Sequence, residues 1–408
     1  MSNFNIFRSL IIPNFLVAFS CVCVAQMPMA PRVFSLNAKT LQLNKQKLAD
    51  PKNADPSLKP ALAKLERDAQ KALAVEILPV TAKTALPPSG DKHDYMSQAP
   101  YFWKNPNTKD GLPYIRKDGE RNPEIKNFPD HEQMDLLGAT VERLATAYYF
   151  TGKEEYAARA ATLLRMWFLD PKTQMNPNLE FAQAVPGVND GRGTGILESR
   201  ALTRVVDGIG LLNGSKSWTA ADQTALVAWF TKYYEWITTS KHGKDEAAAK
   251  NNHGTWYDVQ TTSFALFIGK TDEAKKILEN AKQKRIAFQV EPDGKLPLEL
   301  ARTNSWGYST MDLDGMTQLA DLGDRVGVDL WNYQTSDGRS IRKAIEYLYP
   351  FATKSKKWTT QQIDEFIPEK LYLVMRRAAP HYRDDKFTAM MAAVPALETN
   401  DRIQILGN

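Results

Sequence analysis

Cysteine is almost missing from this chain. Its 408 residues include only Cys21 and Cys23, and both lie within the first 25 positions. A chain of this length is sufficient for one large domain or two ordinary ones. If the first 25 residues are removed on maturation, the remaining chain has no cysteine. A disulfide framework and a cysteine-ligated metal are therefore excluded for the mature protein.

The first 25 residues have the pattern of a secretory signal peptide. Arg8 is the only charged side chain before Gln26, an apolar stretch follows it, and small residues lead up to Ala25. We expect cleavage near Ala25 and export to the periplasm or the medium. A membrane anchor is the alternative, but Pro13 and Asn14 interrupt a segment that is already short for a span. Lipoprotein anchoring through Cys21 fits the flanking residues poorly.

Histidine and clustered positive charge are also scarce. The five histidines are scattered, with no His-x-x-x-His pair, so no zinc site and no cofactor are expected. The formal net charge is only +5, and no run of lysine and arginine with interleaved aromatics occurs. Nucleic acid is therefore not the expected partner. An anionic ligand is compatible with this mild positive balance.

Strand patterns are few, whereas helical periodicity recurs. Residues 289–300 are the best candidate for extended structure. A helix is predicted over 57–74, in a segment from residue 26 to 90 that we expect to pack on the main domain as a helical extension. The main domain, residues 91–408, has nine further predicted helices: 130–152, 154–169, 196–212, 220–239, 254–268, 272–288, 311–326, 340–351 and 369–379. Successive antiparallel pairs of this kind favour an all-α fold, an α/α toroid or incomplete barrel. No fixed-period motif supports a helical repeat array instead.

Asn252 and His253 are the first candidates for chemistry. They precede Gly254 at the predicted start of a helix, and Trp256 follows within the first turn. Backbone N–H groups at a helix N-terminus favour anions, so carboxylate binding is physically sensible there. The plain structural interpretation is an asparagine cap beside a satisfied histidine.

Arg302 and Tyr308 form the second candidate pair. Arg302 can bind a carboxylate with two parallel hydrogen bonds, and Tyr308 offers a phenol on what looks like a glycine-containing turn. A surface ion pair and a packed aromatic are the structural alternatives.

An aromatic loop from Tyr101 to Glu124 is the third candidate. Aromatic rings stack on sugar faces, and cationic side chains bind acidic substituents. The loop residues expected to bind substrate are Tyr101, Trp103, Arg116, Arg121 and Asn122. Proline turns and local ion pairs explain such a loop equally well.

This loop resembles the signature segment of the alginate-lyase-like superfamily of polysaccharide lyases. Asn252 with His253 resembles the Asn-His pair of that family, and Arg302 with Tyr308 resembles its downstream Arg and Tyr, one residue closer together than usual. The resemblance extends from about residue 95 to 379. It implies an α/α toroid that cleaves uronate glycans, of alginate or glucuronan type, by metal-free β-elimination.

β-Elimination removes a proton beside a uronate carboxylate, so that carboxylate must be neutralised. Asn252, Arg302 and His253 are expected to do this, and the loss of one such donor typically slows a reaction about 100- to 1000-fold. A base and an acid must also act. Tyr308 serves as both if the Arg302 cation lowers its pKa; alternatively His253 is the base and Tyr308 only the acid.

Other groups give weaker signals. His131 fits a helix start better than a catalytic role. The glycine-rich stretch 191–200 lacks the Gly-Lys-Ser/Thr ending of a phosphate loop, which excludes nucleotide binding, although Arg200 is expected to line the cleft with Trp256.

Two other functions compete with a lyase. One is a glycoside hydrolase on a similar toroid, whose two carboxylates would come from Asp130, Asp135, Asp190, Glu198, Asp312 or Asp314. The other is a glycan-binding protein without activity. The sequence decides neither the uronate polymer, nor endo- or exo-cleavage, nor the oligomeric state.

Overall fold

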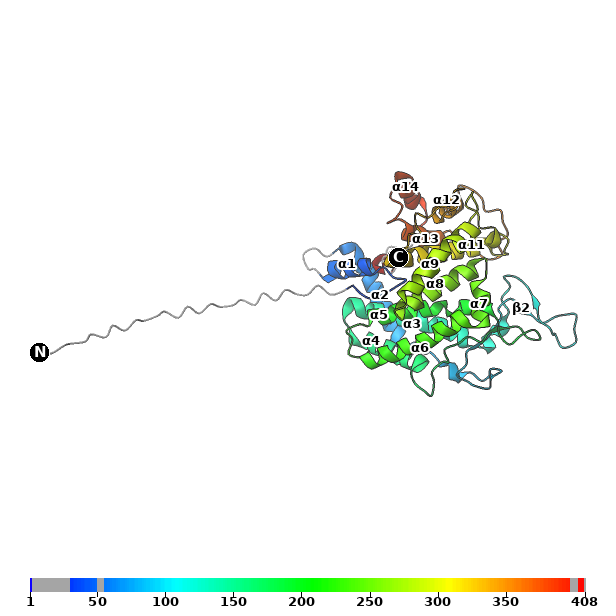
Figure 1. Cartoon of the computed structure of the whole chain (residues 1–408), viewed down its shortest axis with the longest axis horizontal. Coiled ribbons are helices and arrows are strands. Elements are labelled where there is room, and N and C mark those ends of the chain that lie inside the picture. Colours follow the sequence, from blue (N-terminus) through cyan, green and yellow to red (C-terminus); the bar gives the residue numbers. More distant parts are fainter. Residues whose placement is uncertain (2–29, 50–54, 397–402, 407–408) are drawn as a thin grey trace.

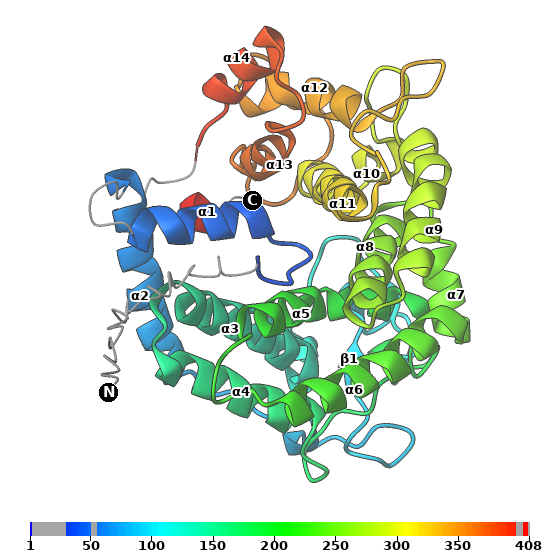
Figure 2. The same ribbon diagram turned by 60° about the vertical axis from the view of Figure 1, so that its left-hand side comes forward.

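The helices form two concentric layers of an incomplete ring (Figures 1 and 2). The computed structural model describes Met1 and residues 30–49, 55–396 and 403–406. The inner layer holds α3 (Asp130–Thr151), α5 (Ala201–Leu211), α8 (Asn252–Phe267), α11 (Ser305–Val326) and α13 (Lys370–Ala378). The outer layer holds α2 (Lys59–Leu73), α4 (Glu154–Phe168), α6 (Ala220–Thr239), α9 (Thr271–Ala281), α12 (Ile341–Ala352) and α14 (Asp385–Ala393). The chain alternates between the layers, which is the predicted α/α toroid.

Burial explains this arrangement. Inner helices pack against each other and against an outer helix, as α8 does against α5, α11, α6 and α9. In α8 every residue except His253 is buried. Outer helices are amphipathic and bury one face only. Gly152 and Gly327 end α3 and α11 in the left-handed conformation, with φ of 69° and 77°.

The N- and C-terminal parts meet where the ring is open. There α1 (Ala38–Ala49) lies between α2 and α13 and contacts α15 (Ile403–Leu406) (Figure 2). The backbone N–H groups of Ser35 and Leu36 donate to the carboxylate of Asp207 on α5, at 2.9 and 2.8 Å. Residues 30–49 and 55–90 thus pack on the ring. The predicted signal peptide, residues 1–25, lies outside the described residues except for Met1.

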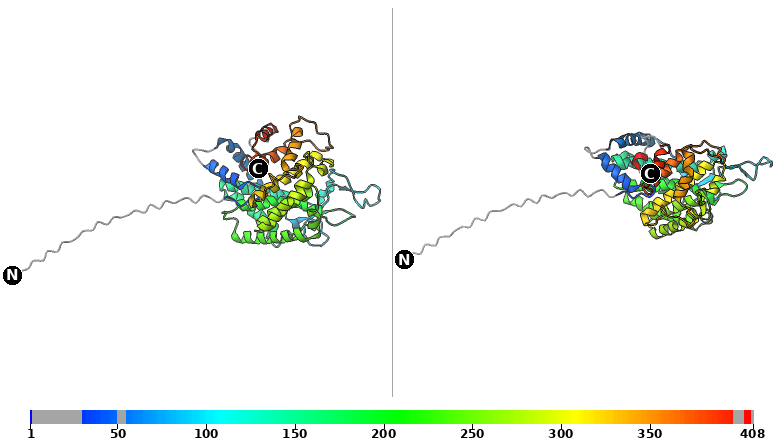
Figure 3. Two further views of the ribbon diagram at one scale, coloured as in Figure 1. Left: turned by 45° about the horizontal axis from the view of Figure 1, so that its top comes forward. Right: turned by 90° about the horizontal axis from the view of Figure 1, so that it is seen from above.

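Short elements connect the helices, and several project from one side of the ring (Figures 1 and 3). The strands are β1 (Met96–Gln98), β2 (Phe102–Trp103), β3 (Ile115–Arg116) and β4 (Phe181–Ala184); β1 pairs with β4 and β2 with β3. The remaining short helices are η1 (Pro56–Leu58), η2 (Val80–Ala82), η3 (Pro123–Asn127), η4 (Gly193–Arg200), α7 (Lys241–Ala247), η5 (Lys282–Ala287) and α10 (Pro297–Leu300). Across the described part of the chain, no helix combines the length and apolar character that a bilayer crossing requires.

Two local predictions are wrong. Residues 289–300 form a turn followed by α10, because Pro297 begins a short helix. Tyr308 lies in the first turn of α11, not on an isolated turn: Asn304 precedes this helix, and the N–H of Tyr308 donates to its carbonyl at 3.0 Å. The predicted helices 130–152, 154–169 and 220–239 agree with α3, α4 and α6 to within a residue.

Candidate active site

The phenol of Tyr308 is held between an aromatic hydroxyl and a cation. Its Oη atom lies 2.7 Å from Oη of Tyr101. The guanidinium of Arg302 lies over the Tyr308 ring, 3.7 Å from its centre. Arg302 in turn binds Asp118, with its Nη2 donating to Oδ1 at 2.8 Å and its Nε at 3.1 Å from Oδ2. The aromatic loop is thereby joined to the start of α11.

This environment raises the pKa of Tyr308 above its ordinary value. Burial is the main cause, the hydrogen bond with Tyr101 adds to it, and the Arg302 cation opposes both without overcoming them. Arg302 does lower the phenol pKa, as expected, but burial and the Tyr101 hydrogen bond outweigh it, so the net pKa of Tyr308 is raised. Tyr308 is protonated at neutral pH.

His253 is oriented by a buried carboxylate. Its Nδ1 lies 2.6 Å from Oε1 of Glu246, and Glu246 is only 2% exposed. If Nδ1 carries the proton that this contact requires, the lone pair is on Nε2. Gly254 permits the arrangement, because a Cβ there would collide with the carbonyl of Ala249 and the guanidinium of Arg285.

Asn252 faces another buried carboxylate. Its backbone N–H donates to Oε1 of Glu299 at 2.7 Å, and its Nδ2 lies 2.9 Å from both Glu299 oxygens. Burial raises the pKa of Glu299, although the Asn252 hydrogen bonds and nearby Arg302 and His253 act against this. The Oδ1 atom of Asn252 is buried without a hydrogen-bond partner. Asn252 itself is 0% exposed.

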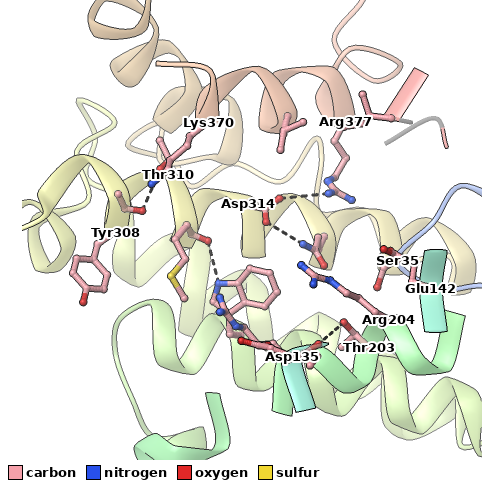
Figure 4. Close-up of a pocket in the computed structure, with 18 of the residues that line it drawn as sticks. Ser35, Asp135, Glu142, Thr203, Arg204, Tyr308, Thr310, Asp314, Lys370 and Arg377 are labelled. Atoms are coloured by element: carbon pink, nitrogen blue, oxygen red, sulfur yellow. Dashed lines mark hydrogen bonds and ion pairs between the residues drawn. The ribbon is translucent and has the colours of Figure 1, made fainter. Parts of the chain in front are cut away.

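A cavity of about 760 Å³ adjoins Tyr101 and Tyr308, whereas Asn252, His253 and Arg302 are not among the residues that line it. Tyr308 lies at one end of it, and Ser35 and Glu142 lie at the other (Figure 4). Of the predicted site residues, those that line the cavity are Tyr101, Arg200, Trp256 and Tyr308. Arg200 lies over the Trp256 ring, 5.1 Å from its centre. His253 lies three residues before Trp256, on the same face of α8.

The cavity is rich in charged side chains. Arg204 from α5 and Lys370 and Arg377 from α13 line it, together with Asp135 and Asp314. Arg377 is engaged by Asp314 at 3.4 Å and by Asp321 at 3.2 Å. A polyanion entering this space meets cations from both sides.

The remaining predicted residues of the loop differ in burial and in their hydrogen-bond partners. Trp103 is half-buried and donates from Nε1 to the carbonyl of Glu120 at 3.0 Å, while Arg116 and Arg121 are exposed. Arg116 binds Asp118 at 2.6 Å. Asn122 is only 2% exposed, and its side chain caps η3 and donates to the carbonyl of Phe102 at 2.8 Å. Asn122 is therefore held within the loop framework, and its contact with substrate stays a prediction.

Sequence reasoning missed the carboxylates that orient the site. Glu246, Glu299 and Asp118 come from α7, α10 and the loop, and no sequence spacing relates them to their partners. It also passed over Gln183, whose Oε1 accepts from Nη2 of Arg192 at 2.8 Å. Gln183 has a φ of 51°, a strained value for a residue with a side chain, and such strain gathers at functional sites. Arg192 lies over the ring of Phe102, 4.9 Å from its centre, beside Tyr101.

Comparison with known proteins decides which family this constellation belongs to. The alginate lyase family profile matches residues 79–358, more than half of the chain. The chain belongs to the alginate lyase family. A crystal structure of an alginate lyase from Bacteroides ovatus is similar to it, with 39% identity and a TM-score of 0.88 over 93% of this chain and 99% of that one.

More distant alginate lyases share the fold. Two variants of alginate lyase A1-III, each complexed with tetrasaccharide, superimpose with TM-scores of 0.56 at 16% and 17% identity. Each comparison covers 93% of this chain and 97% of the other. No curated protein matches the chain.

As a member of the alginate lyase family, the chain is a polysaccharide lyase. Membership sets aside the glycoside hydrolase and the inactive glycan-binding protein. It confirms the predicted α/α toroid and a polysaccharide as substrate. The individual roles of Asn252, His253, Arg302 and Tyr308 stay predictions, as does export.

Proposed function

We propose that this lyase cleaves alginate by β-elimination, with His253 as base and Tyr308 as acid. The proposal is supported by the pairing of His253 with Glu246, since His253 lies on α8, the helix that contributes Trp256 to the cavity wall. The same wall holds the protonated Tyr308. The similar Bacteroides ovatus structure is itself named an alginate lyase.

Neutralisation of the substrate carboxylate falls to Asn252. One N–H of its amide serves both Glu299 oxygens, since these belong to one carboxylate, and the second N–H is left for a ligand. Hydrogen bonds aimed at the carboxylate stabilise the enolate that forms when the neighbouring carbon loses its proton. Arg302 acts from behind the Tyr308 ring, because Asp118 already occupies its guanidinium.

The proton and electron flow is then balanced. His253 Nε2 takes the proton from the carbon next to the carboxylate. The electron pair of that C–H bond forms the new carbon–carbon double bond as the glycosidic C–O bond breaks. Tyr308 gives its proton to the departing oxygen. Solvent afterwards removes the proton from His253 and restores that of Tyr308.

We also propose that the chain is exported and loses its first 25 residues. The single charge at Arg8, the apolar stretch and the small residues before Gln26 support this. Sequencing of the mature protein from a periplasmic or culture fraction tests it: the predicted N-terminus is at or near Gln26, and an intact Met1 in the cell interior contradicts export.

A substrate panel tests the proposed activity. The purified protein is incubated with polymannuronate, polyguluronate and glucuronan, and ultraviolet absorbance is followed. Elimination creates a double bond conjugated with the carboxylate, so absorbance rises on the alginate polymers. Absence of any rise on the two alginate polymers contradicts the proposal, and a rise on glucuronan alone reassigns the substrate.

A further inference from the structure

A second pocket, with a volume of about 640 Å³, lies beside the start of α11. We name it the lysine groove. It is lined by Phe351, Lys354, Lys356, Lys357, Trp358, Thr360, Gln362, Asp364 and Phe366. None of these residues lines the cavity beside Tyr308.

The floor of the lysine groove is aromatic and rigid. Trp358 packs edge-on against Phe351, with ring centres 4.9 Å apart, and donates from Nε1 to Ser305 Oγ at 3.0 Å. Phe366 lies against the fully buried Trp306, with ring centres 4.4 Å apart. Trp358 and Phe366 are themselves half-buried, so part of each ring contacts solvent. Rings fixed in this way are suited to contact the apolar faces of sugars.

The rim of the lysine groove carries excess positive charge. Lys354, Lys356 and Lys357 are exposed, and none of them forms an ion pair with a carboxylate in the described part of the chain. The one acid of the lining, Asp364, accepts from Asn304 Nδ2 at 2.5 Å. Lys354 follows the end of α12 and has a φ of 58°, a strained value for a residue with a side chain. Unpaired lysines over an aromatic floor match a ligand that has both carboxylates and sugar rings.

The lysine groove adjoins the active site through one short segment. Asn304 lines the cavity beside Tyr308, and its side chain also contacts Gln362 and Asp364 in the groove. The backbone N–H of Ser305 donates to the carbonyl of Gln361 at 3.1 Å, and that of Ile363 donates to the carbonyl of Thr303 at 3.0 Å. Two sites on either side of residues 303–305 can hold one chain.

We propose that the lysine groove is a second binding site for the polyuronate, which holds a stretch of chain outside the cleavage site. The ammonium groups bind uronate carboxylates, and Trp358 and Phe366 contact the sugar rings. The choice of a polyuronate as the ligand rests on the proposed function. The site increases affinity for long chains by raising the local concentration of cleavable bonds. It leaves the catalytic step unchanged.

The test is a triple variant of the full chain, Lys354→Gln with Lys356→Gln and Lys357→Gln. Exposed ion pairs contribute modestly, so we expect KM for long alginate to rise about three- to thirtyfold at low ionic strength. We expect kcat to stay unchanged, together with KM for the shortest oligosaccharide that is cleaved. The matched control is Lys275→Gln with Lys276→Gln and Lys284→Gln, which removes the same charge from exposed positions on α9 and η5.

The outcomes separate the groove from the proposed function. Equal KM values for the triple variant and the control on long alginate overturn the groove proposal. A wild-type protein that cleaves no polyuronate overturns the proposed function instead. In that case, electrophoretic migration through a gel that contains alginate still tests the groove proposal. The proposal predicts that the wild type and the control are retarded more than the triple variant. Equal retardation of all three proteins overturns it.

Discussion

Nδ1 of His253 lies 2.6 Å from Oε1 of Glu246, a carboxylate that is only 2% exposed. Such a contact fixes the ring orientation and places the basic lone pair on Nε2. Helix α7 supplies Glu246 and α8 supplies His253, so the pair depends on how these two helices pack. Glu246 is therefore a positioning residue for the proposed base.

Glu246→Gln tests this positioning. The amide cannot hold His253 as a carboxylate does, and we expect kcat/KM to fall by up to about 10,000-fold, the loss seen when the carboxylate that orients a catalytic histidine is replaced by an amide. Glu180→Gln is a matched control, since Glu180 also faces a histidine, His242, at 3.4 Å but is half exposed. Equal activity of the wild type and Glu246→Gln, measured by the absorbance assay, contradicts the role of Glu246.

Tyr308→Phe removes the proposed acid and keeps the ring beneath Arg302. General acid catalysis typically contributes about 100- to 10,000-fold, so kcat should fall by that amount while affinity for alginate persists. Tyr382→Phe provides the control, because it also loses one hydrogen bond, from Oη to the carbonyl of Trp331 at 2.7 Å, and neither residue lines the cavity. Retention of full kcat by Tyr308→Phe would exclude Tyr308 from proton transfer.

The pH profile distinguishes the two assignments of the base. Burial raises the pKa of Tyr308, so an acid role loses activity only as pH rises above about 10, the ordinary value for tyrosine. If ionised Tyr308 were the base, kcat/KM would still rise steeply between pH 8 and 10, because the ordinary pKa of tyrosine is about 10 and the tyrosinate fraction grows with pH below the pKa. We expect a plateau through this range for the wild type. If kcat/KM instead rises about tenfold per pH unit, as the loss of one proton would cause, tyrosinate is favoured as the base.

Asp118→Asn tests the link between the aromatic loop and α11. Burial works against ionisation of Asp118, but hydrogen bonds from Arg302 and from the Thr303 backbone outweigh it and lower the pKa below its ordinary value. A depressed folded-state pKa stabilises the protein above the unfolded value and ceases to do so as pH falls through the folded value. The variant should lose about 1–2 kcal/mol of unfolding free energy at pH 7. Denaturant titrations should show the gap to wild type narrowing below about pH 4; a gap independent of pH contradicts this account.

Treatment with a metal chelator tests whether the proposed side chains are sufficient for the elimination reaction. Every step assigned above uses groups of the protein and solvent, so treatment with a chelator followed by gel filtration should leave kcat/KM on alginate unchanged. Recovery of lost activity on adding back a divalent cation would show that the mechanism is incomplete.

The sequence was a good guide to the helices because their patterns are local. Apolar spacing and glycine at the end define α3, and the capping box at Thr219 defines the start of α6. The predicted extended segment at 289–300 failed because a short apolar run fits a strand and a helical turn equally well. Gly307 favours a turn at Tyr308, whereas the buried Trp306 packs so that the helix begins at Ser305.

The proposed reacting groups could be named from the sequence, but the groups that support them could not. Asn252, His253 and Tyr308 are named because they resemble the motifs of the family in the same order, and their roles stay predictions. Glu246 and Glu299 do not, since a carboxylate in a charged chain gains meaning only from its partner in space. The sign of the pKa shift at Tyr308 likewise depends on burial, which a nearby arginine in the sequence does not reveal.

The most direct test is a digestion of alginate by the wild type and by Tyr308→Phe, with the products analysed by ultraviolet absorbance and mass. The account predicts that the wild type releases ultraviolet-absorbing oligosaccharides, each lighter by one water than the corresponding hydrolysis product, and that Tyr308→Phe releases almost none. Saturated products from the wild type, or undiminished release of unsaturated products by Tyr308→Phe, would contradict it.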